Sequence, residues 1–594
     1  MILAPSRTRV FQVAFFLIAI VLPAHAQKAP AKAPADSLYQ QGLRQLQQGN
    51  LAGARSTFEK VVRLAPNSAE GHNSLGWVLM TSGGSDSDKD KDKAIAQFRL
   101  AIKLKPDFVR AHTNLASALA SKKDLDGAVN EARTAVRLAP SDAESHRELG
   151  RVLSFRSEVP AAIAELSRAT ELAPTRPDLH DELGSLFVQN SQLDEAAAQF
   201  AEALRLQPKF ATAKFHLGVI RWQQHSFEEA QQLLADAVAL TPQNGQAHYY
   251  LGRVLADRGN SDDAIHELQA AVKLQPNLTE AQTQLGLALQ RKGDAVGAVT
   301  AFRQVTEARP DNADAHNNLG LALIQIGDAP TAVTEFQAAL RLQPDDSGYR
   351  GNLGIAYLQR ADFDAAITEF QTALRTTPDD ATLHYNLGLA LKLKDQLPEA
   401  VAEFQKAAQL DPSQADVHYT LGVTFWQQGE FASAVEELRA ATRIRPDYAE
   451  AFYTLGTVLK QQGNLPEAAN ALREAIRLQP DFAGAHTTLA GVLRQQGDAR
   501  GASAESKLGA AMASSTNALQ AATFSTNSGR RMLGAGDLEG AISQFRSAIE
   551  QADAYAPAHF YLAQALKRKG VKEESRREFQ KASELDPAFR NSSE

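Results

Sequence analysis

The chain has 594 residues and no cysteine, and its 62 basic and 69 acidic residues give a formal charge of −7. The absence of cysteine excludes disulfide bonds and thiolate metal sites. The slight acidity, without any dense cluster of Lys or Arg, argues against a nucleic-acid partner.

Residues 1–26 are predicted to be a signal peptide. Two arginines precede an apolar run over residues 10–22, and an Ala-His-Ala sequence ends at residue 26. This run is short for a helix that spans a bilayer. We therefore expect a periplasmic or secreted protein with no stable membrane span after cleavage; the alternative is an N-terminally membrane-anchored protein. Residues 27–34, rich in Ala, Pro and Lys, are predicted to be a linker.

From residue 35 onward, a unit of 34 residues repeats along the chain. Within residues 381–414, His384, Leu387 and Leu391 form one apolar stripe of helical period. A second stripe containing Phe404 follows a short turn, and a proline ends it. Each unit is therefore predicted to be a helix-turn-helix. The prolines that mark the period are Pro106, Pro140, Pro174, Pro208, Pro242, Pro276, Pro310, Pro344, Pro378, Pro412, Pro446 and Pro480.

Small residues occur at fixed places in each unit, whose positions we number from the third residue after the preceding proline. Position 8 is glycine in thirteen of sixteen units, and position 20 is alanine in fifteen. Glycine is unfavourable inside a helix. Its recurrence predicts that the two helices of a unit approach closely there, with Leu at position 7 and Phe or Leu at position 24 filling the space beside them.

This pattern of Leu-Gly, Ala, Phe, Ala and Pro resembles the tetratricopeptide repeat family. The resemblance implies an all-α fold, a right-handed superhelical α-solenoid of about sixteen 34-residue helix-turn-helix repeats whose first helices line a concave groove. Repeats 1–14 are assigned to residues 35–514 and repeats 15–16 to residues 522–587, with a tail over 588–594.

Two places interrupt the period. An insert rich in Asp and Lys near residues 84–92 is expected to be a solvated loop, because its lysines and the lack of the required glycine do not suit a calcium site. Repeat 14 is degenerate, with Ser506 where Phe or Leu is expected. We expect a break or hinge at residues 515–521.

Nothing in the sequence predicts catalysis. Ten histidines fall at position 4, one per repeat, which is too far apart to share a metal ion, so we expect them to pack against the preceding repeat. No Ser/His/Asp arrangement, carboxylate pair or cofactor motif stands out. The chain is therefore predicted to be a non-enzymatic protein with no metal and no cofactor.

The groove is predicted from the family geometry, which points positions 2, 5, 6, 9, 12 and 13 of the first helix inward. Position 6 holds Asn318, Asn352 and Asn386, followed by Thr420. An amide offers both a donor and an acceptor to the backbone of an extended peptide. These asparagines resemble the ladder in the repeat half of O-linked N-acetylglucosamine transferase; the alternative is that asparagine merely fills this position.

Aromatic and basic residues are also predicted to face the groove, although some of the rings could instead pack between helices. The Lys/Arg/Asn carboxylate clamp of family members that bind chaperone tails is not matched. The candidate residues are Tyr385, Tyr419 and Tyr453 at position 5, Trp426, Lys460 and Arg494 at position 12, and a second patch of Trp222, Tyr249 and Arg253.

These features predict a protein–protein interaction scaffold that binds extended peptide segments. An alternative is a periplasmic adaptor in exopolysaccharide or protein export complexes, in which the aromatic residues would stack on glycans. A glycosylation factor like the O-linked N-acetylglucosamine transferase is disfavoured, because the repeats leave no room for a catalytic half.

Overall fold

The computed structural model describes residues 34–81 and 87–592, and all regular structure in these ranges is helical. The all-α helical-repeat fold expected from the sequence is confirmed. The chain divides into two compact units, residues 1–308 and 309–594. The predicted signal peptide and residues 27–33 of the predicted linker lie outside the described residues, whereas Pro34 opens the first helix.

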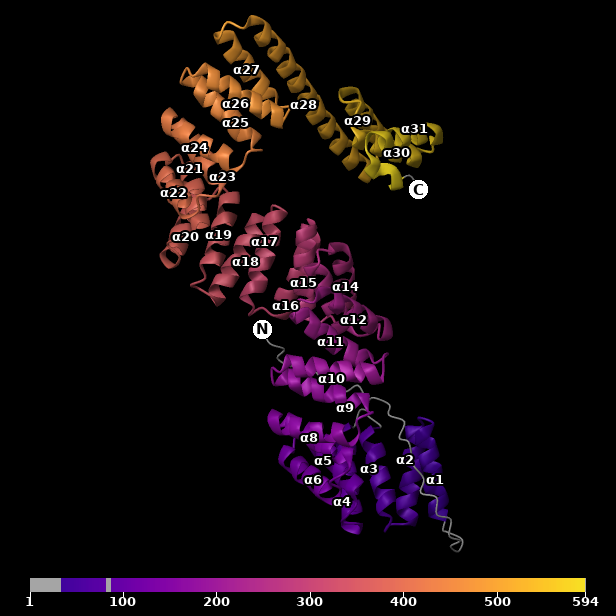
Figure 1. The fold of residues 1–594 in the computed structure, drawn as a ribbon. Helices are drawn as coiled ribbons and strands as arrows, with labels where there is room; N and C mark the ends of the chain where they lie inside the picture. The colour runs from indigo at the N-terminus through magenta and orange to yellow at the C-terminus, as the bar shows by residue number, and fades with distance from the viewer. Residues whose placement is uncertain (1–33, 82–86, 593–594) are drawn as a thin grey trace. The chain divides into compact units, whose positions relative to one another are not determined.

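The first unit contains sixteen α-helices in its described part, and consecutive helices pack together as pairs (Figure 1). They are α1 (Pro34–Gln47), α2 (Leu51–Leu64), α3 (Ala69–Thr81), α4 (Ser87–Leu104), α5 (Val109–Ser121), α6 (Leu125–Leu138), α7 (Ala143–Phe155), α8 (Val159–Leu172), α9 (Pro177–Gln189), α10 (Leu193–Leu206), α11 (Ala211–Gln223), α12 (Phe227–Leu240), α13 (Gly245–Asp257), α14 (Ser261–Leu274), α15 (Thr279–Lys292) and α16 (Ala295–Ala308).

The second unit repeats the same pairing from α17 onward and ends in a short 3₁₀ helix, η1. Its elements are α17 (Ala313–Gln325), α18 (Ala329–Leu342), α19 (Ser347–Gln359), α20 (Phe363–Thr376), α21 (Ala381–Leu393), α22 (Leu397–Leu410), α23 (Ala415–Gln427), α24 (Phe431–Ile444), α25 (Ala449–Gln461), α26 (Leu465–Leu478), α27 (Ala483–Gln495), α28 (Ala499–Gly534), α29 (Leu538–Gln551), α30 (Ala556–Lys569), α31 (Lys572–Leu585) and η1 (Pro587–Ser592).

Glycine at position 8 makes room for the side chain at position 24 of the same repeat. A Cβ atom added to Gly388 would lie 2.6 Å from Cε1 of Phe404, a ring that is fully buried. Where position 24 is leucine, the backbone is close as well, since a Cβ on Gly456 would lie 3.1 Å from the carbonyl oxygen of Ala468. The predicted close approach is therefore confirmed, and its main cause is the position-24 side chain seated on the glycine.

Two of the three exceptions to this rule are complementary in size. Repeat 3 has Ala116 at position 8 and Ala132 at position 24, and repeat 14 has Ala490 and Ser506 at these positions. Where the glycine gains a methyl group in these two repeats, the large side chain opposite it is absent. Repeat 16 differs, because Ala563 at position 8 and the buried ring of Phe579 at position 24 belong to one core cluster. Glycine is thus the usual but not the obligatory residue opposite a large side chain in the repeat core.

The position-4 histidines join the two helices of their own repeat, and nine of the ten also bond to the turn at the end of the preceding repeat. In repeat 11, Nδ1 of His384 lies 2.6 Å from a carboxylate oxygen of Glu403, and Nε2 lies 3.0 Å from the carbonyl oxygen of Pro378 in the preceding turn. Glu or Gln takes the place of Glu403 beside each of the other nine histidines. Their polar role in joining the two helices of one repeat was not predicted.

The two predicted interruptions take different forms in the structure. Residues 87–92 of the insert are not a loop: they add a turn to the start of α4, and Asp90 forms an ion pair with Arg55. The break or hinge expected at residues 515–521 is wrong, since α28 runs without interruption through this segment and serves as the second helix of repeat 14 and the first helix of repeat 15.

Replacing Gly388 with alanine is expected to lower stability by about 1–3 kcal/mol, because the new methyl group would collide with the buried ring of Phe404. The matched control is Gly534→Ala. Gly534 is an exposed helical residue with no atom within 4 Å of an added Cβ, so the same change should raise stability by about 0.5–1 kcal/mol. Urea unfolding followed by circular dichroism measures both; equal shifts of the two midpoints would contradict the steric explanation.

The pair of His112 and Glu131 is expected to make stability depend on pH. Both hydrogen-bond partners of the ring, Glu131 and the carbonyl of Pro106, are acceptors, and the Glu131 hydrogen bond raises the pKa of His112. A raised folded-state pKa means that the stabilisation is complete below about pH 6.5 and is lost as the pH rises through the folded-state pKa.

An NMR titration of the His112 ring measures this pKa, with the signal assigned by its loss in His112→Gln. Glu131→Gln should move the midpoint down toward the ordinary histidine value, because a neutral amide no longer favours the charged ring. An unchanged midpoint in that variant would show that Glu131 is not the cause.

Candidate functional site

The candidate surface in the second unit is formed by the first helices of repeats 9–14, which are α17, α19, α21, α23, α25 and α27. Most neighbouring pairs of these helices are in direct contact. Residues at one repeat position therefore form a row across successive helices. We call this surface the first-helix face and define it by positions 5, 6 and 12 of these repeats.

The predicted asparagine ladder is only partly engaged within the protein. The amide nitrogen of Asn352 donates to the side-chain oxygen of Asn317, 2.8 Å away on the preceding first helix. Asn318 and Asn386 are half-buried and their side chains form no hydrogen bond with the described part of the protein. The face thus offers two unused amides and the free carbonyl oxygen of a third. Thr420, next in the row, lies 3.3 Å from the hydroxyl of Tyr385.

The three tyrosines at position 5 are half-buried, and each lies against another ring. The ring centroids of Tyr385 and Phe404 are 5.7 Å apart, those of Tyr419 and Tyr448 are 5.1 Å apart, and those of Tyr453 and Phe482 are 4.7 Å apart. These tyrosines also pack against the hydrophobic core of the repeats. Much of the surface of each ring is therefore packed between helices, as the alternative interpretation of the sequence expects.

An ion pair that was not predicted holds Tyr448, the residue whose ring lies against Tyr419. Arg445 donates to both carboxylate oxygens of Asp416, at 3.0 and 2.6 Å, and its guanidinium lies 4.6 Å from the centroid of the Tyr448 ring. The hydroxyl of Tyr448 also donates to Asp416, at 3.0 Å. The hydrogen bond from Arg445 lowers the pKa of Asp416. This cluster fixes Tyr448 beside Tyr419.

Position 12 carries a row of cations beside a tryptophan. Trp426 is half-buried and donates its indole N–H to the side-chain oxygen of Gln461 at 2.6 Å. Lys460 lies against Gly491 of the next repeat, where an added Cβ would be 3.0 Å from its ammonium nitrogen. Lys460 and Arg494 form no ion pair with any described residue.

Lys392 belongs to the same row and was missed in the sequence. It occupies position 12 of repeat 11, one repeat before Trp426, and is half-buried. No described acidic group pairs with it, and burial lowers the pKa of its ammonium group. The repeat numbering alone would have found it, because Lys460 and Arg494 share its position.

The residues of the predicted patch in the first unit are bonded within the protein. Arg253 lies 4.7 Å from the centroid of the Trp222 ring and donates to the hydroxyl of Tyr249 at 3.0 Å. Trp222 donates to Asp257 at 2.7 Å. Tyr249 is only 8% exposed. The structure thus brings the three predicted residues together: Arg253 contacts both rings, and the indole N–H of Trp222 is taken by Asp257.

An ion-pair network in the first unit was also not predicted. Glu148 is 4% exposed and accepts hydrogen bonds from Ser117 at 2.6 Å and Arg151 at 2.9 Å, and its burial raises the pKa of this carboxyl. Arg147, on the same helix, donates to both oxygens of Glu182 on α9. The charges of this region therefore neutralise one another, in contrast to Lys392, Lys460 and Arg494 of the second unit.

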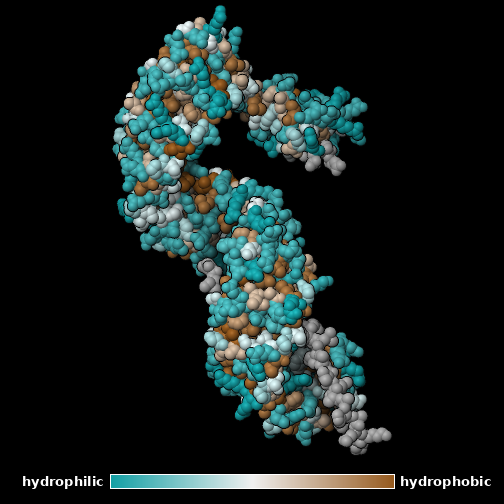
Figure 2. Space-filling model, viewed as in Figure 1, coloured by the Kyte–Doolittle hydropathy of each residue, from teal (hydrophilic) through white to brown (hydrophobic). Residues whose placement is uncertain are grey.

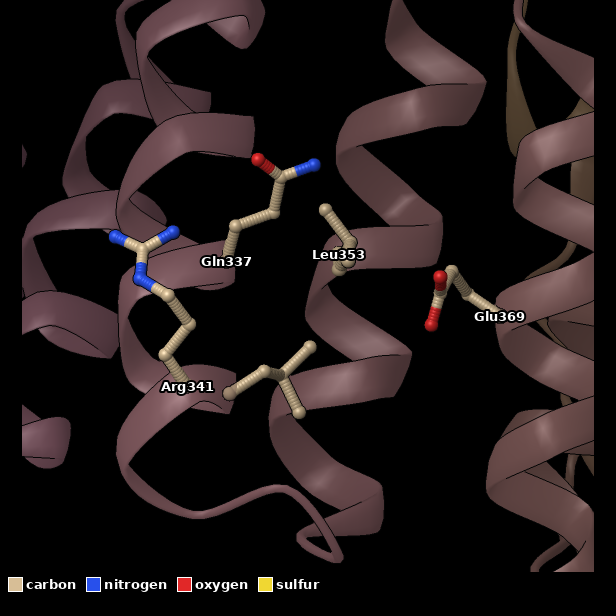
Figure 3. Close-up of a pocket in the computed structure, with 5 residues that line it drawn as sticks. Gln337, Arg341, Leu353 and Glu369 are labelled. Atoms are coloured by element: carbon tan, nitrogen blue, oxygen red, sulfur yellow. The ribbon is translucent and has the colours of Figure 1, made fainter.

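The predicted residues do not line an enclosed cavity. One shallow depression in the second unit lies between Gln337 and Arg341 on α18, Leu353 on α19 and Glu369 on α20, and none of these is a predicted site residue (Figure 3). Over the visible surface hydrophilic residues predominate and hydrophobic ones form small groups (Figure 2). The first-helix face is thus an open surface, suited to a long ligand more than to a small one.

Two further observations concern the described residues only. No group of three or more His, Asp or Glu side chains in them could hold a metal ion. No helix among them is both long enough and apolar enough to cross a membrane.

Three solved structures illustrate the similarity to known folds. The APC/C hetero-tetramer Cut9-Hcn1 is 15% identical, with 78% of this chain and 97% of that chain covered and a TM-score of 0.35. YrrB, described as a TPR protein with an unusual peptide-binding site, is 29% identical, with 30% and 93% covered and a TM-score of 0.29. Yeast Tom70 is 17% identical, with 72% and 96% covered and a TM-score of 0.32.

No curated protein sequence matches the chain. A family model described as the tetratricopeptide repeat matches it over residues 39–86, 89–143, 124–177, 182–244, 220–278, 283–347, 352–415, 394–449, 419–481 and 453–506. These matches cover well over half of the sequence and agree with the helical pairs of the structure. The chain therefore belongs to the tetratricopeptide repeat family.

Proposed function

We propose that the second unit, residues 309–594, is a non-enzymatic scaffold that binds an extended polypeptide along its first-helix face. Tetratricopeptide repeats typically serve protein–protein interaction. The observation that carries the proposal is the row of half-buried polar groups without partners among the described residues, above all Asn318, Asn386 and Lys392. Partly desolvated polar groups without partners cost free energy unless a ligand completes their hydrogen bonds.

The amides supply affinity that does not depend on the ligand's sequence. Asn318 and Asn386 can each donate to a peptide carbonyl and accept from a peptide N–H, and Asn352 keeps its carbonyl oxygen free. A peptide in an extended conformation presents such groups along its whole length. The ladder thus suits a backbone ligand laid across successive repeats.

The cations indicate the side chains that the ligand carries. Lys392, Lys460 and Arg494 have no described acidic partner, and burial of Lys392 disfavours its charged form. A carboxylate placed beside this lysine would offset that penalty. We therefore propose that the ligand bears acidic side chains, bound at position 12 in a way that differs from the carboxylate clamp, which the sequence does not match.

The partial burial of the tyrosine rings favours peptide binding over stacking on glycans. Stacking on sugars requires open aromatic faces, whereas Tyr385, Tyr419 and Tyr453 are half-buried, each beside another ring. The predicted patch of the first unit also offers little to a ligand, because Arg253 bonds to Tyr249 and Trp222 bonds to Asp257. We accordingly place the binding surface in the second unit.

Alanine at both Asn318 and Asn386 is expected to weaken peptide binding about tenfold, because two hydrogen bonds worth about 0.5–1.5 kcal/mol each are lost. The peptides are selected from a displayed library of acidic, extended sequences, and affinities are measured by fluorescence anisotropy. The matched control is Asn114→Ala, which removes an amide at the same repeat position in the first unit, where it donates to Asn73. Equal affinities for both variants, or no selected binder, would contradict the proposal.

Replacing Lys392, Lys460 and Arg494 with glutamine should lower affinity and flatten its dependence on salt, because screening acts on charge pairs. The anisotropy measurement is repeated at rising ionic strength. A salt dependence identical to that of the unaltered protein would show that these cations do not meet the ligand.

We also propose that the chain is exported, on the basis of the sequence of residues 1–26. Cell fractionation followed by N-terminal sequencing is expected to recover a mature protein that begins at Gln27 outside the cytoplasm. A full-length protein retained in the membrane fraction would favour the anchored alternative.

A further inference from the structure

The stacking of repeats is interrupted once in the second unit, at α28. Elsewhere in this unit, the second helix of one repeat is joined by a short turn to the first helix of the next, and the two pack together as antiparallel neighbours. Residues 499–534 instead form one helix, so repeat 14 lacks a following first helix and repeat 15 lacks a preceding second helix (Figure 1). One repeat-to-repeat interface is therefore missing.

Phe524 shows what this interruption exposes. It occupies position 3 of repeat 15 and is 71% exposed. Position 3 is buried in every other repeat that follows a described second helix; these residues are Gly71, Ala111, Ser145, Leu179, Ala213, Ala247, Ala281, Ala315, Tyr349, Leu383, Val417, Ala451, Ala485 and Ala558. A large apolar side chain thus stands uncovered at a position that the fold otherwise buries.

Part of the surface that normally covers position 3 is also uncovered. Elsewhere position 3 packs beside positions 27 and 28 of the preceding second helix, as Ala558 does beside Ala548 and Ile549. In repeat 14, position 28 is Ala510, which is exposed. Gly509, at position 27 of the same repeat, is buried beside Thr487, so the uncovered part of this surface is the small residue Ala510.

Both uncovered positions lie on one side of α28. Ser503, Ala510, Asn517 and Phe524 follow at intervals of seven residues and are all exposed. A seven-residue interval is close to two turns of an α-helix, so these side chains form one stripe. We call it the α28 stripe. No charged residue occurs between Lys507 and Arg530, so nothing repels an approaching helix with the same sequence.

We propose that a second copy of this chain covers the α28 stripe, with its own α28 antiparallel to the first. A two-fold axis beside Asn517 would place Phe524 of each chain against Ala510 of the other. Each pair would restore the missing contact between position 28 and position 3, and the two Asn517 amides would face each other across the axis. The interface is isologous, with repeat 14 of one chain continuing into repeat 15 of the other.

The mass of the full chain in solution tests this dimer. Light scattering coupled to size-exclusion chromatography is expected to give twice the mass of one chain. Phe524→Asp should halve it with unchanged helical circular dichroism, because a buried carboxylate opposite Ala510 has no partner, whereas Phe524→Leu should keep the dimer. A one-chain mass at every concentration overturns the proposal, and so does a dimer that persists in Phe524→Asp.

Thiol cross-linking tests the geometry, since the chain has no cysteine of its own. Asn517→Cys should be joined to a second chain by a short bis-maleimide. Ser515→Cys, on the opposite side of the same helix, should not. Equal cross-linking of both variants would overturn the antiparallel arrangement. A monomer in which the thiol of the Asn517→Cys variant is protected would overturn it as well, and would assign the stripe to a contact within the chain or to another protein.

Discussion

The steric fit between position 8 and position 24 is the constraint on which the repeat depends. Phe404 lies where a Cβ on Gly388 would have to be, and the same relation recurs with Phe or Leu along both units. Because the second helix approaches where the first carries no side chain or only a methyl group, the fit also sets how the helices of a repeat pack. The position-4 histidine and its Glu or Gln partner add a polar link between the same two helices.

This packing leaves the two units with different surfaces. In the first unit, Glu148, Arg147 and the Trp222 cluster form closed networks of hydrogen bonds and ion pairs. In the second unit, Lys392 and two asparagines of the first-helix face have no partner among the described residues. The interior of each repeat is nearly constant, so differences in function arise from positions 5, 6 and 12, which the core does not constrain.

Irregularities in the period matter because a repeat contacts only its neighbours. In repeat 14, Ser506 replaces the usual Phe or Leu, and Ser514 replaces the proline that ends most other repeats. The chain does not become a loop there, because residues rich in Ala, Ser and Leu continue the helix through α28. Helix propensity thus decided the local conformation once the stop signal was gone. The consequence is a missing interface rather than a flexible joint, and it leaves Phe524 exposed.

The sequence by itself determined the helix pairs, their period and the family, because glycine, alanine and proline at fixed spacing leave few conformations for each unit. It also located most of the candidate surface through repeat position. The tertiary structure decided which of those side chains remain free. Lys392 has no acidic partner among the described residues, Trp426 is bonded to Gln461, and the three tyrosines lie against neighbouring rings. Such pairing joins residues of different helices, and no local pattern of the sequence encodes the distance between them.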